Sequence, residues 1–268
     1  MRRFFIDPNA IEGNVVTLSR EESHHAVSVL RLKKGDGLDL FDGRGNQFGG
    51  RVVDIKEGSV SVRLEPAAAV SGNFAALPVE VTLAVSVIKP DRMDTLIQKA
   101  AELAASAIVP VLSERSVVKL SGERWEGKVK RWRKIALESC KQCGQPRIPE
   151  ISAPRRFEDV LADSGRYDKI LIPTLAVRGD ILYKTLSVSG AKRILALIGP
   201  EGDFTPEEVK LACSRGAAPV SLGPLVLRSE TAALYLLSVL NFYCREVAPE
   251  KDAWRQGPPG RLDHGALR

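Results

Sequence analysis

The chain has 268 residues, of which 44% are hydrophobic and 27% charged, a composition typical of a globular protein with a packed core rather than of a disordered chain. No apolar run approaches the roughly 20 residues of a membrane-spanning helix, and the basic N-terminus has no signal-peptide segment, so we expect a cytoplasmic protein without a membrane partner. The net charge of +6 and the pI near 9.2 favour a polyanionic partner.

Residues 1–70 are predicted to form a small β-barrel domain. Alternating strands at 51–55 and 60–64 flank a polar turn, which is typical of a hairpin. A short helix is expected at 23–32, where apolar side chains recur at helical spacing before Gly35. Several short strands joined by tight turns favour a closed sheet, and the residues after Pro66 have the composition of a linker.

From residue 75 to 247 the pattern changes to alternating strands and helices, which predicts an α/β domain with a mostly parallel sheet covered on both faces. Strands are expected at 79–88, 108–112, 169–172, 193–198 and 220–222, and helices at 91–105, 123–143, 156–163, 206–215 and 230–246. Residues 248–268 are rich in Gly, Pro and charge and are expected to be a disordered tail.

The positive charge is concentrated in one segment. Between Glu114 and Arg147, ten basic residues face only four acidic ones, so this segment carries as much charge as the excess of the whole chain. It either attracts phosphates or forms a solvated helix face. Cys140 and Cys143 have C-x-x-C spacing, but they lie within a predicted helix and no second pair completes a zinc site, so we expect no metal.

Two strand exits near the C-terminus have unusual loops. The first runs Ile198-Gly-Pro-Glu-Gly and leads through Thr205 and Glu208, spaced as a capping box, into a helix. The second, Leu222-Gly-Pro-Leu-Val-Leu-Arg-Ser-Glu-Thr-Ala, places apolar residues in irregular backbone, where they could wall an adenine pocket. Neither loop has the spacing of a Rossmann fingerprint or a P-loop. Ligands of open parallel sheets bind at such exits.

These two loops, in this order, resemble the cofactor loops of the RsmE family of SPOUT methyltransferases. The segments that begin at Gln98, Ser113 and Glu138 are similar to earlier blocks of that family, and residues 3–36 resemble its PUA-like RNA-binding domain. The resemblance implies a SPOUT domain with a C-terminal trefoil knot that works as a homodimer. It also implies S-adenosylmethionine as the cofactor and N3 of a uridine in 16S ribosomal RNA, free or within the 30S subunit, as the target.

The resemblance carries over to specific residues. Arg228 and Glu230 are expected at the reacting centre, with an ion pair between them at the helix start as the alternative. Binding of RNA is expected at Arg3, Arg31, Lys33, Arg115, Gln142 and Arg147. Binding of the cofactor is expected at Pro173, Thr174, Ile198, Gly199, Pro200, Glu201, Gly202, Leu222, Gly223, Leu227, Arg228, Thr231 and Ala232.

Several interpretations of single residues and of the function remain open from the sequence alone. Glu201 is as well suited to bracing its loop as to binding ribose, and Lys99 with Glu102 is expected to be a structural pair. The chain departs from the family at Leu225, where an Arg is common, and at Ser229, where a Thr is common. A non-catalytic RNA-binding assembly factor, or a SPOUT enzyme acting on transfer RNA, are the competing functions.

Overall fold

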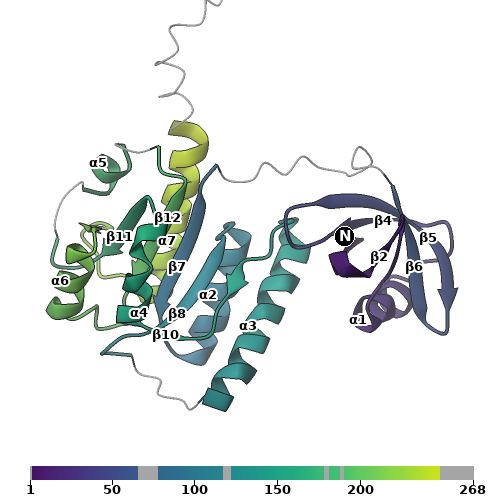
Figure 1. Cartoon of the computed structure of the whole chain (residues 1–268), viewed down its shortest axis with the longest axis horizontal. Coiled ribbons are helices and arrows are strands. Elements are labelled where there is room, and N and C mark those ends of the chain that lie inside the picture. Colours follow the sequence, from purple (N-terminus) through teal and green to yellow (C-terminus); the bar gives the residue numbers. More distant parts are fainter. Residues whose placement is uncertain (1, 66–77, 117–121, 178–180, 188–189, 248–268) are drawn as a thin grey trace, which may run out of the picture.

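The computed structural model describes residues 2–65, 78–116, 122–177, 181–187 and 190–247, and these form two sheets (Figure 1). The tail at 248–268 and most of the expected linker lie outside the described residues. No helix within these ranges has the length and apolar character to cross a membrane.

The N-terminal part is a six-stranded sheet in the order β1-β4-β5-β6-β3-β2. Its strands are β1 (Arg3–Phe5), β2 (Ile11–Glu12), β3 (Val15–Thr17), β4 (Gly37–Phe41), β5 (Gln47–Lys56) and β6 (Ser59–Glu65). The hairpin expected between residues 51 and 64 is confirmed, since β5 and β6 pair antiparallel. The expected helix begins earlier, because Ser19 caps α1 (Arg20–His24), and it continues as a π-helical turn at His25–Val29.

The second sheet is entirely parallel, as the alternating pattern predicts. Its order is β10-β8-β7-β12-β11-β13, with β9 pairing β8. The strands are β7 (Glu80–Ser86), β8 (Ala107–Leu112), β9 (Glu150–Ile151), β10 (Arg155–Arg156), β11 (Lys169–Pro173), β12 (Arg193–Ile198) and β13 (Ala217–Val220). β11 lies between β12 and β13, so the connection from β12 to β13 crosses over β11.

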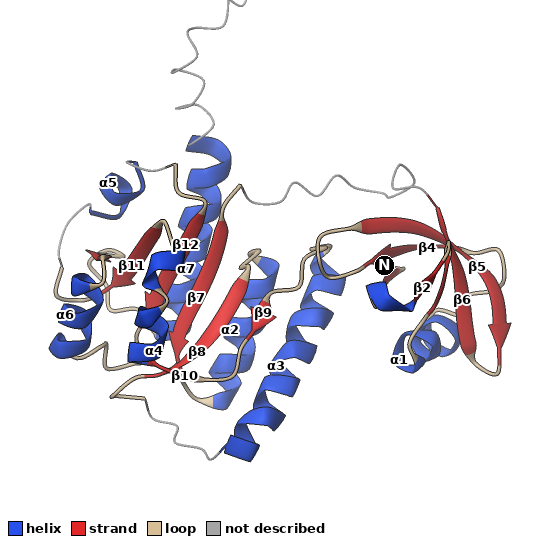
Figure 2. Ribbon diagram, in the orientation of Figure 1, coloured by secondary structure: helices blue, strands red, loops and turns tan. Residues whose placement is uncertain are grey.

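Helices cover both faces of this sheet (Figure 2). They are α2 (Pro90–Glu102), α3 (Gly122–Cys143), α4 (Phe157–Ala162), α5 (Ile181–Ser187), α6 (Pro206–Ser214) and α7 (Ser229–Phe242), with a π-helical turn at Tyr243–Val247 and 3-10 turns at Pro8–Ala10 and Ser164–Arg166. One core contains side chains of α2, α3 and α7, and the other contains those of α4 and α6. Successive residues of β7 point to opposite cores, with Leu83 in the first and Ala84 in the second.

The helix predicted at 91–105 is confirmed as α2, and its stripe of apolar side chains at helical spacing, Met93, Leu96, Ile97 and Ala100, is fully buried. The last predicted strand was wrong in its position: the structure has β13 at Ala217–Val220 rather than at 220–222. Gly216, at a φ of +89°, ends α6 and turns the chain directly into the strand.

The small sheet docks on the C-terminal end of α3, which lies between it and the parallel sheet (Figure 1). Phe41 of β4 belongs to the main core of the large domain rather than to the core of its own sheet. Backbone hydrogen bonds from Gly45 to Pro146 (3.2 Å) and from Ile148 to Gly43 (2.9 Å) join the two parts. The two halves therefore share apolar and hydrogen-bonded contacts.

Candidate active site

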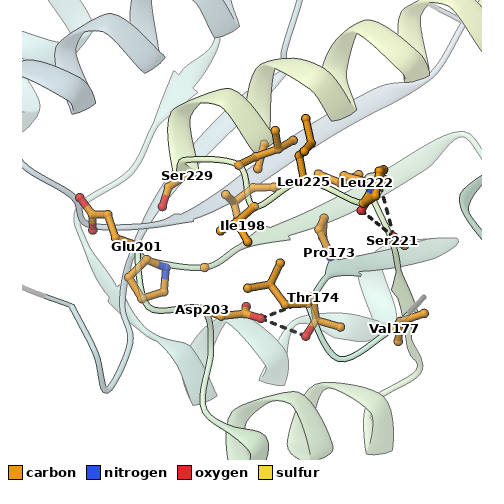
Figure 3. A pocket seen from close by; sticks show the side chains of 18 residues that line it. Pro173, Thr174, Val177, Ile198, Glu201, Asp203, Ser221, Leu222, Leu225 and Ser229 are labelled. Carbon is orange, nitrogen blue, oxygen red and sulfur yellow. Dashed lines mark hydrogen bonds between the residues drawn. The ribbon is translucent and has the colours of Figure 1, made fainter. Parts of the chain in front are cut away.

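A pocket of about 750 Å³ lies where β11, β12 and β13 end, within the 300–1,000 Å³ range typical of ligand pockets. Figure 3 shows Glu201 and Ser229 at one end of it and Val177 and Ser221 at the other. Many predicted cofactor residues line it: Pro173, Thr174, Ile198, Gly199, Pro200, Glu201, Leu222, Gly223, Leu227 and Ala232. The two loops singled out in the sequence therefore meet with a third, the exit of β11.

The structure explains why glycine occupies positions 199 and 223 of these two loops. A Cβ on Gly199 would approach the backbone nitrogen of Phe204 to 3.1 Å and Oδ1 of Asp203 to 3.2 Å, so a side chain there would require the loop to shift. Gly223 has a φ of +111°, which L side chains rarely adopt. Glycine is therefore favoured at position 199 by the close approach of neighbouring atoms and at position 223 by the backbone conformation.

Asp203 ties the first loop to the exit of β11. Its Oδ2 accepts hydrogen bonds from the Thr174 hydroxyl (3.1 Å) and the Leu175 backbone (3.0 Å), and its Oδ1 accepts one from Phe204 N–H (2.8 Å). Its φ of +60° is tolerated by Asp, so the turn forms without a glycine at this position. Asp203 was not among the predicted site residues, although it lines the pocket.

The predicted capping box at the start of α6 is confirmed, with Thr205 and Glu208 bonded reciprocally. Glu208 also accepts a hydrogen bond from the backbone of Glu114 (2.9 Å), which follows β8. Next to it, the Arg115 guanidinium donates to the carbonyl of Gly202 at 2.6 Å. The loop after β8 thus braces the loop after β12.

The first turn of α7 offers polar groups to the pocket. Arg228 is the N-cap residue, yet no side chain caps the helix. Ser229 is buried and lines the pocket, and its Oγ has no hydrogen-bond partner within the described residues. A buried hydroxyl without a partner, beside free N–H groups of a helix start, is suited to bind an acceptor group of a ligand.

Arg92, in the first turn of α2, connects this helix to both loops. Its Nη1 lies 3.1 Å from Oε1 of Glu201, and its Nε lies 3.9 Å from Oε1 of Glu230. The other carboxylate oxygen of Glu230 is buried without a partner among the described residues. Arg92 was not predicted, because its sequence position shows only a residue in the first turn of a helix. The bracing role weighed for Glu201 fits this geometry.

Three predicted cofactor residues, Gly202, Arg228 and Thr231, lie outside the pocket lining. Arg228 is exposed, and the alternative of an ion pair with Glu230 is wrong within the described part of the chain, where Glu230 faces Arg92 instead. The lining also includes Leu225 and Val226, apolar residues of the second loop that were expected to wall an adenine pocket. It further includes residues that the sequence did not single out for the site: Leu175, Val177, Asp203, Ser221, Pro224 and Ser229.

The predicted RNA-binding residues are divided by the structure. Arg31, Lys33, Gln142 and Arg147 are exposed. Arg3 is only 6% exposed, stacks at 4.7 Å over the Phe41 ring and donates to Gln47. Its prediction as an RNA contact is therefore wrong for this arrangement, since burial between the two domains keeps its guanidinium from solvent.

Other polar residues considered in the sequence make contacts within the fold and lie outside the pocket lining. Lys99 donates to Glu102 at 2.9 Å, as expected. His25 packs against Phe4, with ring centroids 5.7 Å apart, while the neighbouring His24 is exposed. Burial raises the pKa of the Cys140 thiol to about 12, so it does not supply a thiolate at neutral pH.

The fold and the pocket define an RNA-modifying methyl transferase: residues 75–241 match the RNA methyltransferase domain family, and residues 18–65 match the RNA methyltransferase PUA domain family. The chain belongs to the ribosomal RNA small subunit methyltransferase E family. It is 30% identical over 250 residues to the Bacillus subtilis member, covering 90% of this chain and 96% of that protein. It is 34% identical over 238 residues to the Mesomycoplasma hyopneumoniae member, covering 89% and 98%.

Solved structures agree with this assignment. The Neisseria gonorrhoeae ribosomal RNA small subunit methyltransferase E, bound to S-adenosyl methionine, matches with a TM-score of 0.75 and 30% identity over 90% of this chain and 97% of that one. A putative Legionella pneumophila methyltransferase with bound cofactor SAM matches with a TM-score of 0.78 and 32% identity, covering 90% and 96%. The resemblance to the RsmE family read from the two loops is confirmed.

Proposed function

We propose that this protein transfers a methyl group from S-adenosylmethionine to N3 of a uridine in 16S ribosomal RNA. The observation that carries the proposal is the pocket formed by three strand-exit loops, with the unpartnered Ser229 hydroxyl in its wall. Relatives named ribosomal RNA small subunit methyltransferase E, and a structural neighbour bound to S-adenosyl methionine, support the substrate and the donor.

The residues present fit this donor. Apolar side chains such as Ile198, Leu222 and Leu227 suit the faces of an adenine, while loop N–H and C=O groups suit its edge. Ser229 and the free N–H groups of α7 suit a polar group at the other end. The bound donor supplies an electrophilic methyl group.

The chain itself must hold the base and accept a proton. N3 lies on the Watson–Crick edge of uracil, so the target nucleotide has to be unpaired or flipped out of its stack. Arg228 is exposed beside the pocket mouth and its planar donors suit a phosphate or the negative charge of a deprotonated uracil. Glu230, whose buried oxygen is free among the described residues, is the group proposed to accept or relay the N3 proton.

The proposal also covers the organisation of the molecule. Residues 1–70 act as the RNA-binding domain and 75–247 as the catalytic domain, whose C-terminal crossing forms a trefoil knot. A homodimer is supported by exposed apolar side chains: Leu225 (73% exposed), Val226 (74%), Tyr235 and Phe242. Exposed Arg31, Lys33, Gln142 and Arg147 are proposed to contact RNA. The site of action is the cytoplasm, where ribosomal subunits assemble, and no metal takes part.

Two measurements test the proposal. Calorimetry with S-adenosylmethionine should show saturable binding, whereas a non-catalytic RNA-binding factor should show no heat. Mass spectrometry of ribosomal RNA from a strain lacking the gene should show loss of one N3-methyluridine from 16S RNA. Loss of a ribose methylation or of a transfer RNA modification would instead favour another SPOUT activity.

A further inference from the structure

A second hollow, of about 790 Å³, lies at the junction of the two domains. One wall is the β4–β5 loop of the small sheet, including Arg44 and Asn46. The other wall is the edge of the parallel sheet where β7 and β12 begin, at Glu80 and Arg193. Since the active-site pocket lies where these parallel strands end, the two hollows are at opposite ends of the sheet.

The shape of this hollow is set by the docked β4–β5 loop. The Asp42 carboxylate accepts hydrogen bonds from the backbone of Arg44 (2.8 Å) and from the backbone and side chain of Asn46 (3.1 and 2.6 Å). A Cβ on Gly43 would approach Cδ1 of Ile148 to 2.8 Å, so the loop packs against the large domain at glycine distance. Hydrogen bonds within the loop and packing against Ile148 therefore hold this wall in place.

Basic side chains of both domains face the hollow: Arg44, Arg147, Lys192 and Arg193. Two of them are held by acidic neighbours, Arg147 by Glu80 at 3.0 Å and Arg193 by Asp168 at 3.6 Å. Arg44 and Lys192 are exposed and have no acidic partner in the part of the chain that the structure describes. Two uncompensated positive charges thus face one groove from its two walls.

We infer that this junction groove binds the phosphate backbone of the substrate RNA, away from the nucleotide that is methylated. β12 has six residues, and at about 3.3 Å per residue the groove lies about 20 Å from the active-site pocket. Only an extended polyanion can occupy both positions at once, and guanidinium and ammonium groups bind phosphates without reading sequence. The inference rests on the proposed function, since it takes RNA as the substrate.

The test is the double variant Arg44→Ala with Lys192→Ala in the full-length protein. Removing two phosphate contacts should weaken binding to a 16S RNA fragment at least about tenfold at 0.1 M salt and lower the slope of log K against log salt by about 2. Because the groove is remote from the reacting base, KM for RNA should rise while kcat at saturating RNA stays at the wild-type value. S-adenosylmethionine affinity by calorimetry should be unchanged.

The matched control is Arg63→Ala with Lys210→Ala, which also removes one exposed Arg from the small domain and one exposed Lys from the large one. This control should keep the wild-type salt slope. A wild-type KM and slope in the groove variant, or an equal loss in the control, would overturn the groove while leaving the methyltransferase assignment intact. If the wild-type protein bound the donor but no RNA, the proposed function would fail first, and the groove with it.

Discussion

The guanidinium of Arg92 lies between the carboxylates of Glu201, in the loop after β12, and Glu230, in the first turn of α7. Its side chain is about a quarter exposed, so these pairs are partly shielded from solvent, unlike ordinary surface pairs. Arg92 also begins α2, which packs against α7. It therefore orients the Glu230 side chain from a neighbouring helix.

We expect Arg92→Gln to lower the rate of methyl transfer by about 10- to 100-fold, because a misdirected Glu230 no longer meets its proton. Arg92→Lys should restore part of the rate, since it keeps the charge. Arg131→Gln is the control: it breaks the pair between the exposed Arg131 of α3 and Asp94 of α2 (2.7 Å) and should leave the rate unchanged. Equal rates for wild type and Arg92→Gln, measured with tritiated donor, would remove Arg92 from the site.

Arg228 lies outside the pocket lining, on the exposed side of the α7 start. We expect Arg228→Ala to abolish methylation yet leave the affinity for S-adenosylmethionine within about twofold, because this side chain meets RNA or the uracil rather than the donor. Calorimetry and a single-turnover assay on the same variant check both statements. Unchanged turnover would exclude Arg228 from the mechanism.

At the scale of single elements, the turn from β12 into α6 depends on Glu208. Its carboxylate is buried and accepts hydrogen bonds from the backbone of Thr205 (2.9 Å) and Glu114 (2.9 Å). The first bond holds the end of the loop that carries Gly199 and Glu201, and the second ties that end to the segment after β8. The same carboxylate therefore stabilises the start of α6 and the conformation of the pocket loop.

Glu208→Ala should lower the free energy of unfolding by about 2 kcal/mol, because it removes a helix cap and leaves a buried N–H without a partner. It should also weaken donor binding, since the loop loses its anchor. Glu207→Ala, an exposed change in the same helical turn, should cost less than about 0.5 kcal/mol. Urea denaturation and calorimetry give both quantities; comparable losses in the two variants would contradict the anchoring role.

The elements that the sequence predicts well are those with strong local signals. The stripe of α2, the Thr205 cap and the β5–β6 hairpin follow from periodicity and turn chemistry. Strands β1 and β4 were not predicted, because Arg3–Phe5 is too short to show a period and pairs with β4 across more than thirty residues. Long-range pairing of this kind leaves no local pattern.

The site shows the same division. The two donor loops were predicted from Gly and Pro spacing, together with the family resemblance. Pro173 and Thr174 of the third loop were predicted from the resemblance, but the hydrogen bond of Thr174 to Asp203 and the position of Arg92 were not, because these contacts exist only after the sheet has formed. Arg3 was wrongly placed on the surface for a related reason: no local signal indicates that the small sheet buries it against Phe41.

At the scale of the whole molecule, two carboxylates of α1 meet two lysines of α3 across the domain junction. Glu22 and Lys141 form a buried pair at 2.8 Å, and the adjacent Glu21 pairs in an exposed position with Lys134, about two turns earlier on α3. Burial raises the pKa of Glu22 despite the nearby lysine. Burial alone would lower the pKa of Lys141, but Glu22 and Glu138 together raise it. The contribution of these pairs to the stability of the domain junction therefore depends on pH.

The linkage has opposite signs at the two carboxylates. With its folded pKa raised above about 4.5, Glu22 contributes stability that is present below that pH and lost as pH rises through the folded pKa. Glu21, whose pKa is lowered by the Lys134 hydrogen bond, contributes stability that is present above about 4.5 and lost as pH falls. Chemical denaturation between pH 4 and 7 should therefore separate Glu22→Gln from Glu21→Gln.

The free energy of unfolding of the wild type, minus that of Glu22→Gln, should be larger at pH 4 than at pH 7. The same difference for Glu21→Gln should be larger at pH 7, and small, because that pair is exposed and screened by salt. If the difference for Glu22→Gln instead grew with pH, attraction by Lys141 would outweigh the cost of burial. The pair would then stabilise the domain junction more at neutral pH than in mild acid.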